Sequence, residues 1–256
     1  MLTIKIIPVL EDNYIYLIHD PVSKQTAAVD PAEAQPVLDV LAENGWQLSY
    51  VLNTHHHWDH TNGNLQLKQK TGCQIIAPSA EQHKIPGVDR AISDHETLAL
   101  GAHTATVMAI PGHTLGHIAY YFGDDGLLFC GDTLFVMGCG RLFEGTAEQM
   151  WTSLQKLSEL PAATRVYCTH EYSQANGLFA QRIEPDNQQL KEKMQRIKQL
   201  RKQNLPTVPS TIAEERATNP FLRVGQLSVQ TSLNQVQQNP VAVFAELRKR
   251  KDTFFQ

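Results

Sequence analysis

The sequence lacks the features that mark secreted and membrane-spanning proteins. No segment approaches the ~20 apolar residues that a membrane-spanning helix needs, and residues 1–8 show neither the basic start nor the long apolar stretch of a signal peptide. The four cysteines form no CxxC pair and suggest no disulfide framework. We therefore expect a cytoplasmic protein with reduced thiols that has no membrane among its partners.

A strong excess of basic residues is also absent. The 256 residues carry a formal net charge of −4, which argues against a nucleic-acid partner because such binding usually needs a large positive excess. The charge is divided unevenly, since residues 171–256 contain 13 Lys and Arg against 8 Asp and Glu, and the remainder contains 9 against 18. A modest basic region beside a small-molecule site would favour an anionic ligand.

Potential metal ligands are concentrated in residues 55–60, which read HHHWDH and follow a short apolar run. If this segment stays extended, His55 and His57 point to the same side, because side chains in a strand alternate. A turn in the middle of the run would then bring Asp59 and His60 toward a second point. Imidazole and carboxylate ligands in this mixture suit zinc or a similar metal rather than calcium.

Three further residues complete the pattern, and each follows an apolar, strand-like run: His113, Asp132 and His170. Strand ends that return to one rim of a sheet would bring them to the same place as the first group. Gly112 and Gly131 beside them would let the backbone approach a crowded site. The seven residues together predict a site for two metals.

The order of predicted elements indicates an α/β fold. Up to residue 170, short strands alternate with helices such as 34–44 and a helix that Thr146 and Gln149 cap and that runs to residue 160. After residue 170 the strand signal vanishes, and 187–204 reads as a long polar helix. The glutamine-rich stretch 226–238 is predicted to be a loop. We therefore expect a metal domain over 1–170 and a helical substrate-binding domain over 171–256.

The ligand run, with the three later residues, resembles the metallo-β-lactamase superfamily. Residues 139–145 (CGRLFEG), 170–172 (HEY), 219–223 (NPFLR) and 248–252 (RKRKD) are similar to those of its glyoxalase II, or hydroxyacylglutathione hydrolase, branch. The resemblance covers essentially the whole chain. It implies an αββα sandwich with the metals at one rim and a helical C-terminal domain.

The resemblance also implies two divalent metal ions, with zinc expected and iron or manganese as alternatives. His55, His57 and His113 would hold the first metal, while Asp59, His60 and His170 would hold the second. Asp132 would bridge the two, so that Asp59 and Asp132 serve catalysis. A water between the metals would lose a proton and attack the thioester carbonyl. The implied reaction is hydrolysis of S-2-hydroxyacylglutathione, in particular S-D-lactoylglutathione to glutathione and D-lactate, the second step of methylglyoxal detoxification.

The resemblance assigns glutathione binding to Arg141, Phe143, Tyr172, Arg248 and Lys251. Arg248 and Lys251, one helical turn apart, would meet the glycine carboxylate of the tripeptide, with Arg248 acting as a bidentate fork. Many relatives have Lys at position 141 and Tyr at position 143. Arg141 keeps the charge with a different donor geometry, and Phe143 lacks a hydroxyl. The two differences predict weaker substrate binding.

Other hydrolases of the superfamily, such as a lactonase or a β-lactamase, are the main alternatives. The complete Asp59-His60 pair and Asp132 argue against a β-lactamase, and a persulfide dioxygenase with a single iron would keep fewer ligands. The overall acidic charge argues against a nuclease. A non-catalytic metal-binding module would usually lose a ligand, and none is lost here. Nothing in the sequence argues against a monomer.

The remaining histidines have no predicted role as ligands. His56 would point away from the metals if the run is extended, and both it and His117 are expected to support ligands or structure. The other four are expected on the surface or in loops: His19, His83, His95 and His103. Cys139 has no neighbouring base in the sequence, which argues against a nucleophilic role.

Overall fold

The structure is a computed structural model that describes residues 1–254, and its chain divides into two compact units. Unit 1 contains Met1–Ala109 and Thr114–Gly131, and unit 2 contains Ile110–His113 and the chain from Asp132 onward. Each unit is built from its own elements. The predicted division of the chain after residue 170 stays a prediction.

Unit 1 contains a six-stranded sheet in the order β1-β2-β3-β4-β5-β6. Its first three strands are antiparallel, and β3 to β6 run parallel. The strands are β1 (Thr3–Val9), β2 (Asn13–His19), β3 (Gln25–Val29), β4 (Gln47–Leu52), β5 (Gln74–Pro78) and β6 (Arg90–Ile92). The parallel half matters for function, because β3 and β4 end side by side and deliver the loops that follow them to the same edge.

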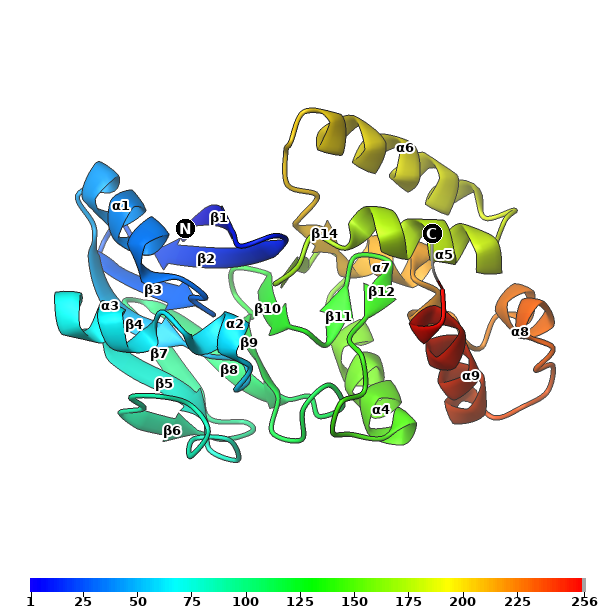
Figure 1. The fold of residues 1–256 in the computed structure, drawn as a ribbon, viewed down its shortest axis with the longest axis horizontal. Coiled ribbons are helices and arrows are strands. Elements are labelled where there is room, and N and C mark those ends of the chain that lie inside the picture. The colour runs from blue at the N-terminus through cyan, green and yellow to red at the C-terminus, as the bar shows by residue number, and fades with distance from the viewer. Residues whose placement is uncertain (255–256) are drawn as a thin grey trace. The chain divides into compact units, whose positions relative to one another are not determined.

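Helices α1 (Ala34–Asn44) and α3 (Asn64–Thr71) cover one face of this sheet (Figure 1). Apolar residues of the strands and helices, among them Leu17, Val37 and Leu67, form one buried cluster between the two layers. Helix α1 ends as predicted at Gly45, which has φ of 64° and donates its N–H to Leu41 and Ala42. A glycine adopts this left-handed conformation without the steric penalty of a Cβ atom.

The other strands of unit 1 form an antiparallel layer in the order β10-β9-β8-β7. They are β7 (Thr97–Leu100), β8 (His103–Ala109), β9 (Ile118–Phe122) and β10 (Leu127–Gly131). Aromatic side chains join this layer to the first sheet. The rings of Tyr16 and Phe129 lie 5.5 Å apart, and the Tyr120 hydroxyl donates a hydrogen bond to the Asn53 carbonyl at 3.0 Å.

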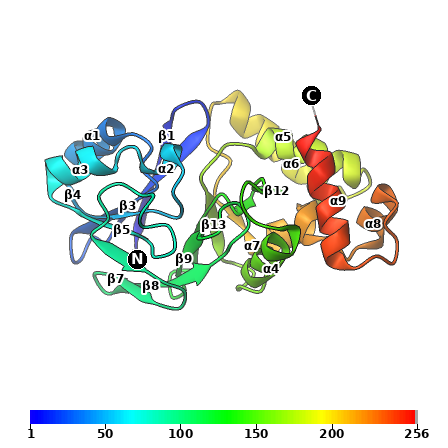
Figure 2. The same cartoon turned by 60° about the horizontal axis from the view of Figure 1, so that its bottom comes forward.

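Unit 2 is mainly helical. Its short strands are β11 (Leu134–Phe135), β12 (Gly138–Cys139), β13 (Arg165–Cys168) and β14 (Ser210–Thr211). Its helices are α4 (Ala147–Ser158), α5 (Ser173–Ile183), α6 (Gln188–Lys202), α7 (Ile212–Thr218), the 3-10 helix η1 (Pro220–Leu222), α8 (Leu227–Leu233) and α9 (Pro240–Asp252). Helix α9, drawn in red in Figure 2, packs against α4, α8 and η1. The rings of Trp151 and Phe244 form part of the α4–α9 contact, with centroids 6.3 Å apart.

Several predicted elements are confirmed. Thr146 and Gln149 form the capping box of α4, which ends at Ser158, two residues before the predicted end. Helix α6 lies within the predicted range 187–204 and begins at the cap Asn187. None of the helices within residues 1–254 combines the length and the apolar character that a membrane crossing requires.

Two predictions about local structure are wrong. The glutamine-rich stretch is not all loop, because residues 227–233 form α8, whose Val229 and Leu233 are buried one turn apart. His19 is not a surface residue but lies buried on β2, where its ring stacks on Trp46 with centroids 4.1 Å apart. In both places a tertiary partner supplies the apolar environment that the local sequence does not reveal.

The turn between β2 and β3 predicts a dependence of stability on pH. The Ser23 side chain and the backbone N–H of Val22 hydrogen-bond to Asp20 and lower the pKa of its carboxyl group from 3.8 to about 2. Because the folded pKa is the lower one, this carboxylate stabilises the fold above pH 4, and the contribution disappears as the pH falls from about 4 to about 2.

We expect Asp20→Asn to lower the free energy of unfolding at pH 7, and we expect the difference from the unmodified protein to shrink below pH 4. Urea denaturation over this pH range measures it. Asp39→Asn, at an exposed residue that accepts a hydrogen bond only from Gln35 on its own helix, is the control. A difference that stays constant with pH would contradict the assignment.

Candidate metal centre

The loop after β4 brings two imidazoles together. His55 is buried, and its Nε2 lies 3.1 Å from Nδ1 of His57. The other nitrogen of His55 faces the Thr54 hydroxyl at 3.0 Å. The two nearest nitrogens therefore belong to residues two positions apart, as the alternation of the sequence predicted, and they face a common point.

The second part of the run forms a short helix, α2 (Trp58–Thr61), rather than the expected turn. His60 is buried in it, and its Nε2 lies 3.4 Å from Oδ2 of Asp59. Asn13 donates a hydrogen bond to the same carboxylate oxygen at 3.0 Å. Imidazole and carboxylate thus lie close together at the start of α2.

Asp30 holds both parts of the run in place. This buried carboxylate, directly after β3, accepts hydrogen bonds from the backbone N–H of Thr54 at 2.7 Å and from its hydroxyl at 2.6 Å. Its Oδ2 also lies 3.2 Å from Nδ1 of His60. A carboxylate on one ring nitrogen orients the ring and leaves the other nitrogen for a metal.

Glu81 links the ligand run to the loop between β8 and β9. Its Oε2 accepts the backbone N–H of His56 at 2.9 Å and contacts that residue's Nδ1 at 2.9 Å. Its Oε1 accepts the N–H of Gly116 at 2.8 Å. His56 is thus directed to Glu81, while the next histidine of that loop, His117, stacks on His55 with centroids 4.6 Å apart.

In unit 2, one oxygen of Asp132 is placed between two imidazoles. Its Oδ2 lies 3.4 Å from Nε2 of His113 and 3.4 Å from Nε2 of His170, while Thr169 donates its hydroxyl proton to Oδ1. Nδ1 of His113 lies 2.8 Å from the carbonyl oxygen of Arg141. Since a carbonyl only accepts, Nδ1 carries a proton and donates it, which leaves Nε2 directed toward Asp132.

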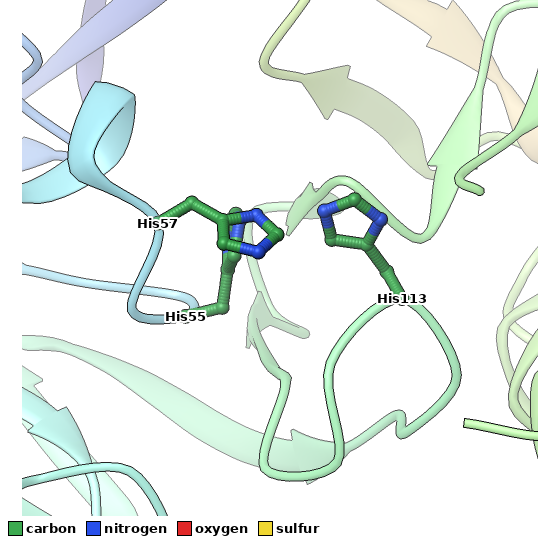
Figure 3. A group of neighbouring side chains, drawn as sticks. All are labelled: His55, His57 and His113. Carbon is green, nitrogen blue, oxygen red and sulfur yellow. The ribbon is translucent and has the colours of Figure 1, made fainter. Parts of the chain in front are cut away.

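Figure 3 shows His113 with His55 and His57. His55 and His57 belong to unit 1, whereas His113, in the loop that follows β8, belongs to unit 2. Imidazoles and carboxylates held in place by neighbouring groups are the set that zinc, iron and manganese bind. The residues present therefore fit divalent metals, and the assignment of each predicted ligand stays a prediction.

A cavity of about 480 Å³ in unit 2 contains the predicted substrate residues. It is lined by His113, Asp132, Phe135, Cys139, Arg141, Phe143, Tyr172, Ala175, Asn176, Arg248, Lys251 and Phe254. The Tyr172 ring stacks on His170 with centroids 4.8 Å apart, and the Phe143 ring packs on the edge of His113 at 5.1 Å. The cavity thus joins two predicted metal ligands to all five predicted glutathione contacts.

The polar lining of the cavity is strongly basic. Burial lowers the pKa of Lys251, and the neighbouring charges of Arg248 and Arg141 lower it further. Burial raises the pKa of Cys139 to about 11. The three cations favour an anionic ligand, and the protonated thiol is unsuited to be a nucleophile.

Helical segments of unit 2 hold the hairpin β11–β12, which forms one wall of the cavity. Buried Glu215 accepts the backbone N–H of Met137 at 2.8 Å and pairs with Lys193. Asn219 donates to the carbonyl oxygens of Phe135 and Gly138 at 3.2 and 2.9 Å. These contacts fix the backbone between Asp132 and Arg141.

Sequence reasoning missed the carboxylates that support the site. Asp30 gave one usable signal, because an acidic residue directly after a buried strand resembles the position of Asp132 after its own strand. Glu81 and Glu215 gave none, since both lie in stretches whose contacts are set by tertiary structure alone. Asn219 belongs to the NPFLR segment that carried the family resemblance, although its contact with the hairpin was not foreseen.

The comparisons with known proteins agree with this architecture. The family model described as metallo-beta-lactamase superfamily matches residues 13–170, and the model described as hydroxyacylglutathione hydrolase C-terminus matches residues 171–254. The crystal structure titled ETHE1 from Myxococcus xanthus has a TM-score of 0.67 at 24% identity, covering 99% of both chains. The fold is therefore the α/β sandwich of the metallo-β-lactamase superfamily.

Whole-chain relatives narrow this assignment. The chain is 55% identical to a hydroxyacylglutathione hydrolase of Methylococcus capsulatus over 99% of both chains. It is 46% identical to one of Maricaulis maris over the same shares. The chain belongs to the hydroxyacylglutathione hydrolase family.

The contacts of Asp30 predict a large effect on stability. Asp30→Ala leaves the buried Thr54 N–H and hydroxyl without this acceptor, and each orphaned group costs about 1–3 kcal/mol. We expect the free energy of unfolding, measured by urea denaturation with a chelator present, to fall by about 3 kcal/mol. Asp39→Ala, on exposed α1 surface, should change it by no more than about 0.5 kcal/mol. Equal effects of the two substitutions would refute the role given to Asp30.

Proposed function

We propose that the chain hydrolyses S-2-hydroxyacylglutathione thioesters, with S-D-lactoylglutathione giving glutathione and D-lactate. The relatives that match its whole length carry the name hydroxyacylglutathione hydrolase. This reaction would be the second step of methylglyoxal detoxification. We propose that residues 1–170 form the domain that binds the metals and that residues 171–256 form the domain that makes most contacts with glutathione.

The observation that carries the proposal is the lining of the cavity in unit 2. His113 and Asp132 meet Arg141, Arg248 and Lys251 on its surface, so that predicted metal ligands and cationic side chains face one space. A thioester of glutathione has the matching composition, because its carboxylates lie at a distance from the reactive carbonyl. A neutral lactone gives these cations no carboxylate to bind, and the carboxylate of a β-lactam antibiotic lies only a few bonds from the reactive carbonyl.

Two divalent metals, which we propose to be zinc with iron or manganese as alternatives, would polarise the thioester carbonyl and lower the pKa of a bound water. We propose that His55, His57 and His113 hold the first. Asp59, His60 and His170 would hold the second. Asp132 would bridge them, which is consistent with the equal distances from its Oδ2 to two imidazoles.

The side chains that line the cavity would orient the substrate. Arg248 and Lys251 would hold the glycine carboxylate, Arg141 would contribute charge at the cavity mouth, and Tyr172 would pack along the tripeptide. The leaving thiolate of glutathione is stable near neutral pH, so no side chain needs to protonate it. We propose that the chain acts as a monomer without a nucleic-acid partner.

The test of this function is the hydrolysis rate of S-D-lactoylglutathione by the purified protein, compared with a lactone and a β-lactam. We expect fast turnover of the thioester alone, and we expect a chelator to abolish it. Turnover of the lactone or the β-lactam in preference to the thioester would reject the proposal.

The bridging role of Asp132 is tested in the same preparation. We expect Asp132→Ala to lose bound metal, measured by elemental analysis, together with thioester hydrolysis, because two dications close together repel without a shared anion. Asp125→Ala, which removes a carboxylate paired with His103 in unit 1, is the control. Full turnover by Asp132→Ala would rule out the bridge.

Phe143 should limit the affinity for substrate. The residue is 63% exposed and lines the cavity, and a hydroxyl on its ring would add one hydrogen bond to the bound tripeptide. One neutral hydrogen bond contributes about 1 kcal/mol, so Phe143→Tyr should lower KM about fivefold with kcat little changed. Steady-state kinetics measure both, and an unchanged KM would contradict the prediction.

A further inference from the structure

One cation of the cavity already has a carboxylate partner on its own helix. Asp252 lies one turn beyond Arg248 at the end of α9, and its Oδ1 accepts a hydrogen bond from Nε of Arg248 at 3.0 Å. The same oxygen lies 2.9 Å from Nη2 of that arginine. The Nε–Nη2 edge of the guanidinium, one of the two that could grip a carboxylate with two parallel hydrogen bonds, is therefore occupied.

The rest of this guanidinium is also constrained. Nη1 of Arg248 donates to the carbonyl oxygen of Cys139 at 2.8 Å, and the group lies over the Phe221 ring at 5.1 Å. The Arg248 side chain is only 6% exposed, whereas that of Asp252 is 42% exposed. The arginine is thus fixed by the protein, and Asp252 is the partner that can exchange with solvent or with a ligand.

Asp252 faces more than one of the cations. Its Oδ1 lies 3.9 Å from Nε of Arg141, whose side chain is exposed. Its charge also acts on Lys251, the residue that precedes it. A single carboxylate oxygen consequently interacts with the group of positive charges to which we assign the carboxylate of the substrate.

We propose that Asp252 occupies the anion position of this cavity as an internal substitute, and that the carboxylate of a glutathione thioester displaces it from Arg248 on binding. The inference deepens the proposed function and rests on it. Asp252 then weakens the binding of substrate and of glutathione alike, because each must first break the Arg248–Asp252 pair. It keeps the buried guanidinium paired while the cavity holds no ligand.

The opposite role makes the opposite prediction. If Asp252 only orients Arg248 for the substrate, its removal frees the guanidinium to turn and weakens binding. Asp252→Ala therefore distinguishes the two roles. Displacement predicts that the substitution strengthens the binding of substrate and glutathione, and orientation predicts that it weakens it. Since Asp252 is at the exposed end of a helix, the substitution leaves the core intact.

The same helix offers a matched control. Glu246 makes an ion pair with Arg250 at 2.8 Å, with the same spacing of four residues, but Arg250 does not line the cavity, whereas Arg248 does. Glu246→Ala removes an equal charge from α9 without touching Arg248. Asp252→Asn keeps the shape and one hydrogen-bond acceptor and removes only the charge.

The experiment measures Kd of glutathione by calorimetry and KM and kcat for S-D-lactoylglutathione in the metal-loaded protein. At low ionic strength, Asp252→Ala should lower Kd and KM about fivefold with kcat unchanged, and Asp252→Asn should do so to a smaller extent. The effect should shrink in 0.5 M sodium chloride, because salt screens exposed charges. Glu246→Ala should match the unmodified protein. Equal or weaker binding by Asp252→Ala overturns the proposal.

A second measurement separates this inference from the function on which it rests. Sulfate is an anion that the cationic side chains of the cavity can bind whatever the substrate is. Because Asp252 no longer competes with it in Asp252→Ala, low millimolar sulfate should raise Tm more in this variant than in Glu246→Ala. Equal shifts overturn the inference. Absence of thioester hydrolysis in the unmodified protein rejects the proposed function instead, and the sulfate result still decides whether Asp252 occupies an anion position.

Discussion

Buried carboxylates that accept backbone N–H groups determine where the histidines of this protein lie. A buried charge is costly unless it is paired and hydrogen-bonded, and Asp30 and Glu81 meet that requirement through Thr54, His56 and Gly116. The segments that carry these groups have no regular secondary structure of their own. Their geometry therefore depends on two side chains far away in the sequence, and the directions of the imidazoles follow from it.

A buried carboxylate that accepts a backbone N–H also occurs in unit 2, where it shapes the cavity. Glu215 is completely buried, and its charge is balanced by Lys193 while its other oxygen accepts the N–H of Met137. Asn219 adds two hydrogen bonds to carbonyl groups of the same hairpin. The C-terminal helices thus contribute to the cavity in two ways, by presenting Arg248 and Lys251 and by fixing the hairpin β11–β12.

Local signals in the sequence predicted those features whose causes are local. The end of α1 follows from a glycine with positive φ, and the start of α4 follows from a reciprocal cap between Thr146 and Gln149. The alternation of residues 55–57 predicted that His55 and His57 point to one side, and their nearest ring nitrogens lie 3.1 Å apart. The strand-end pattern predicts His113, Asp132 and His170 as further ligands, and this stays a prediction.

The features that sequence reasoning missed depend on partners distant in the chain. The helix at Leu227–Leu233 exists because Val229 and Leu233 find a buried environment, and His19 is buried because Trp46 covers its ring. Helix α5 contains Gly177, a poor helix former, and a Cβ atom there would lie 1.8 Å from the sulfur of Met194. The close packing of α5 on α6 thus explains why a glycine occurs at position 177, although glycine disfavours a helix.

Cys139 has a consequence for the redox behaviour of the protein. It lines a cavity in which we propose that glutathione is released, and a free thiol beside glutathione is the usual starting point for a mixed disulfide. Exchange requires the thiolate, and a pKa of about 11 leaves roughly one part in ten thousand of this thiol ionised at pH 7. Within residues 1–254 all four cysteines are buried. The protein is thereby suited to work in a glutathione pool of changing oxidation state without being modified by it.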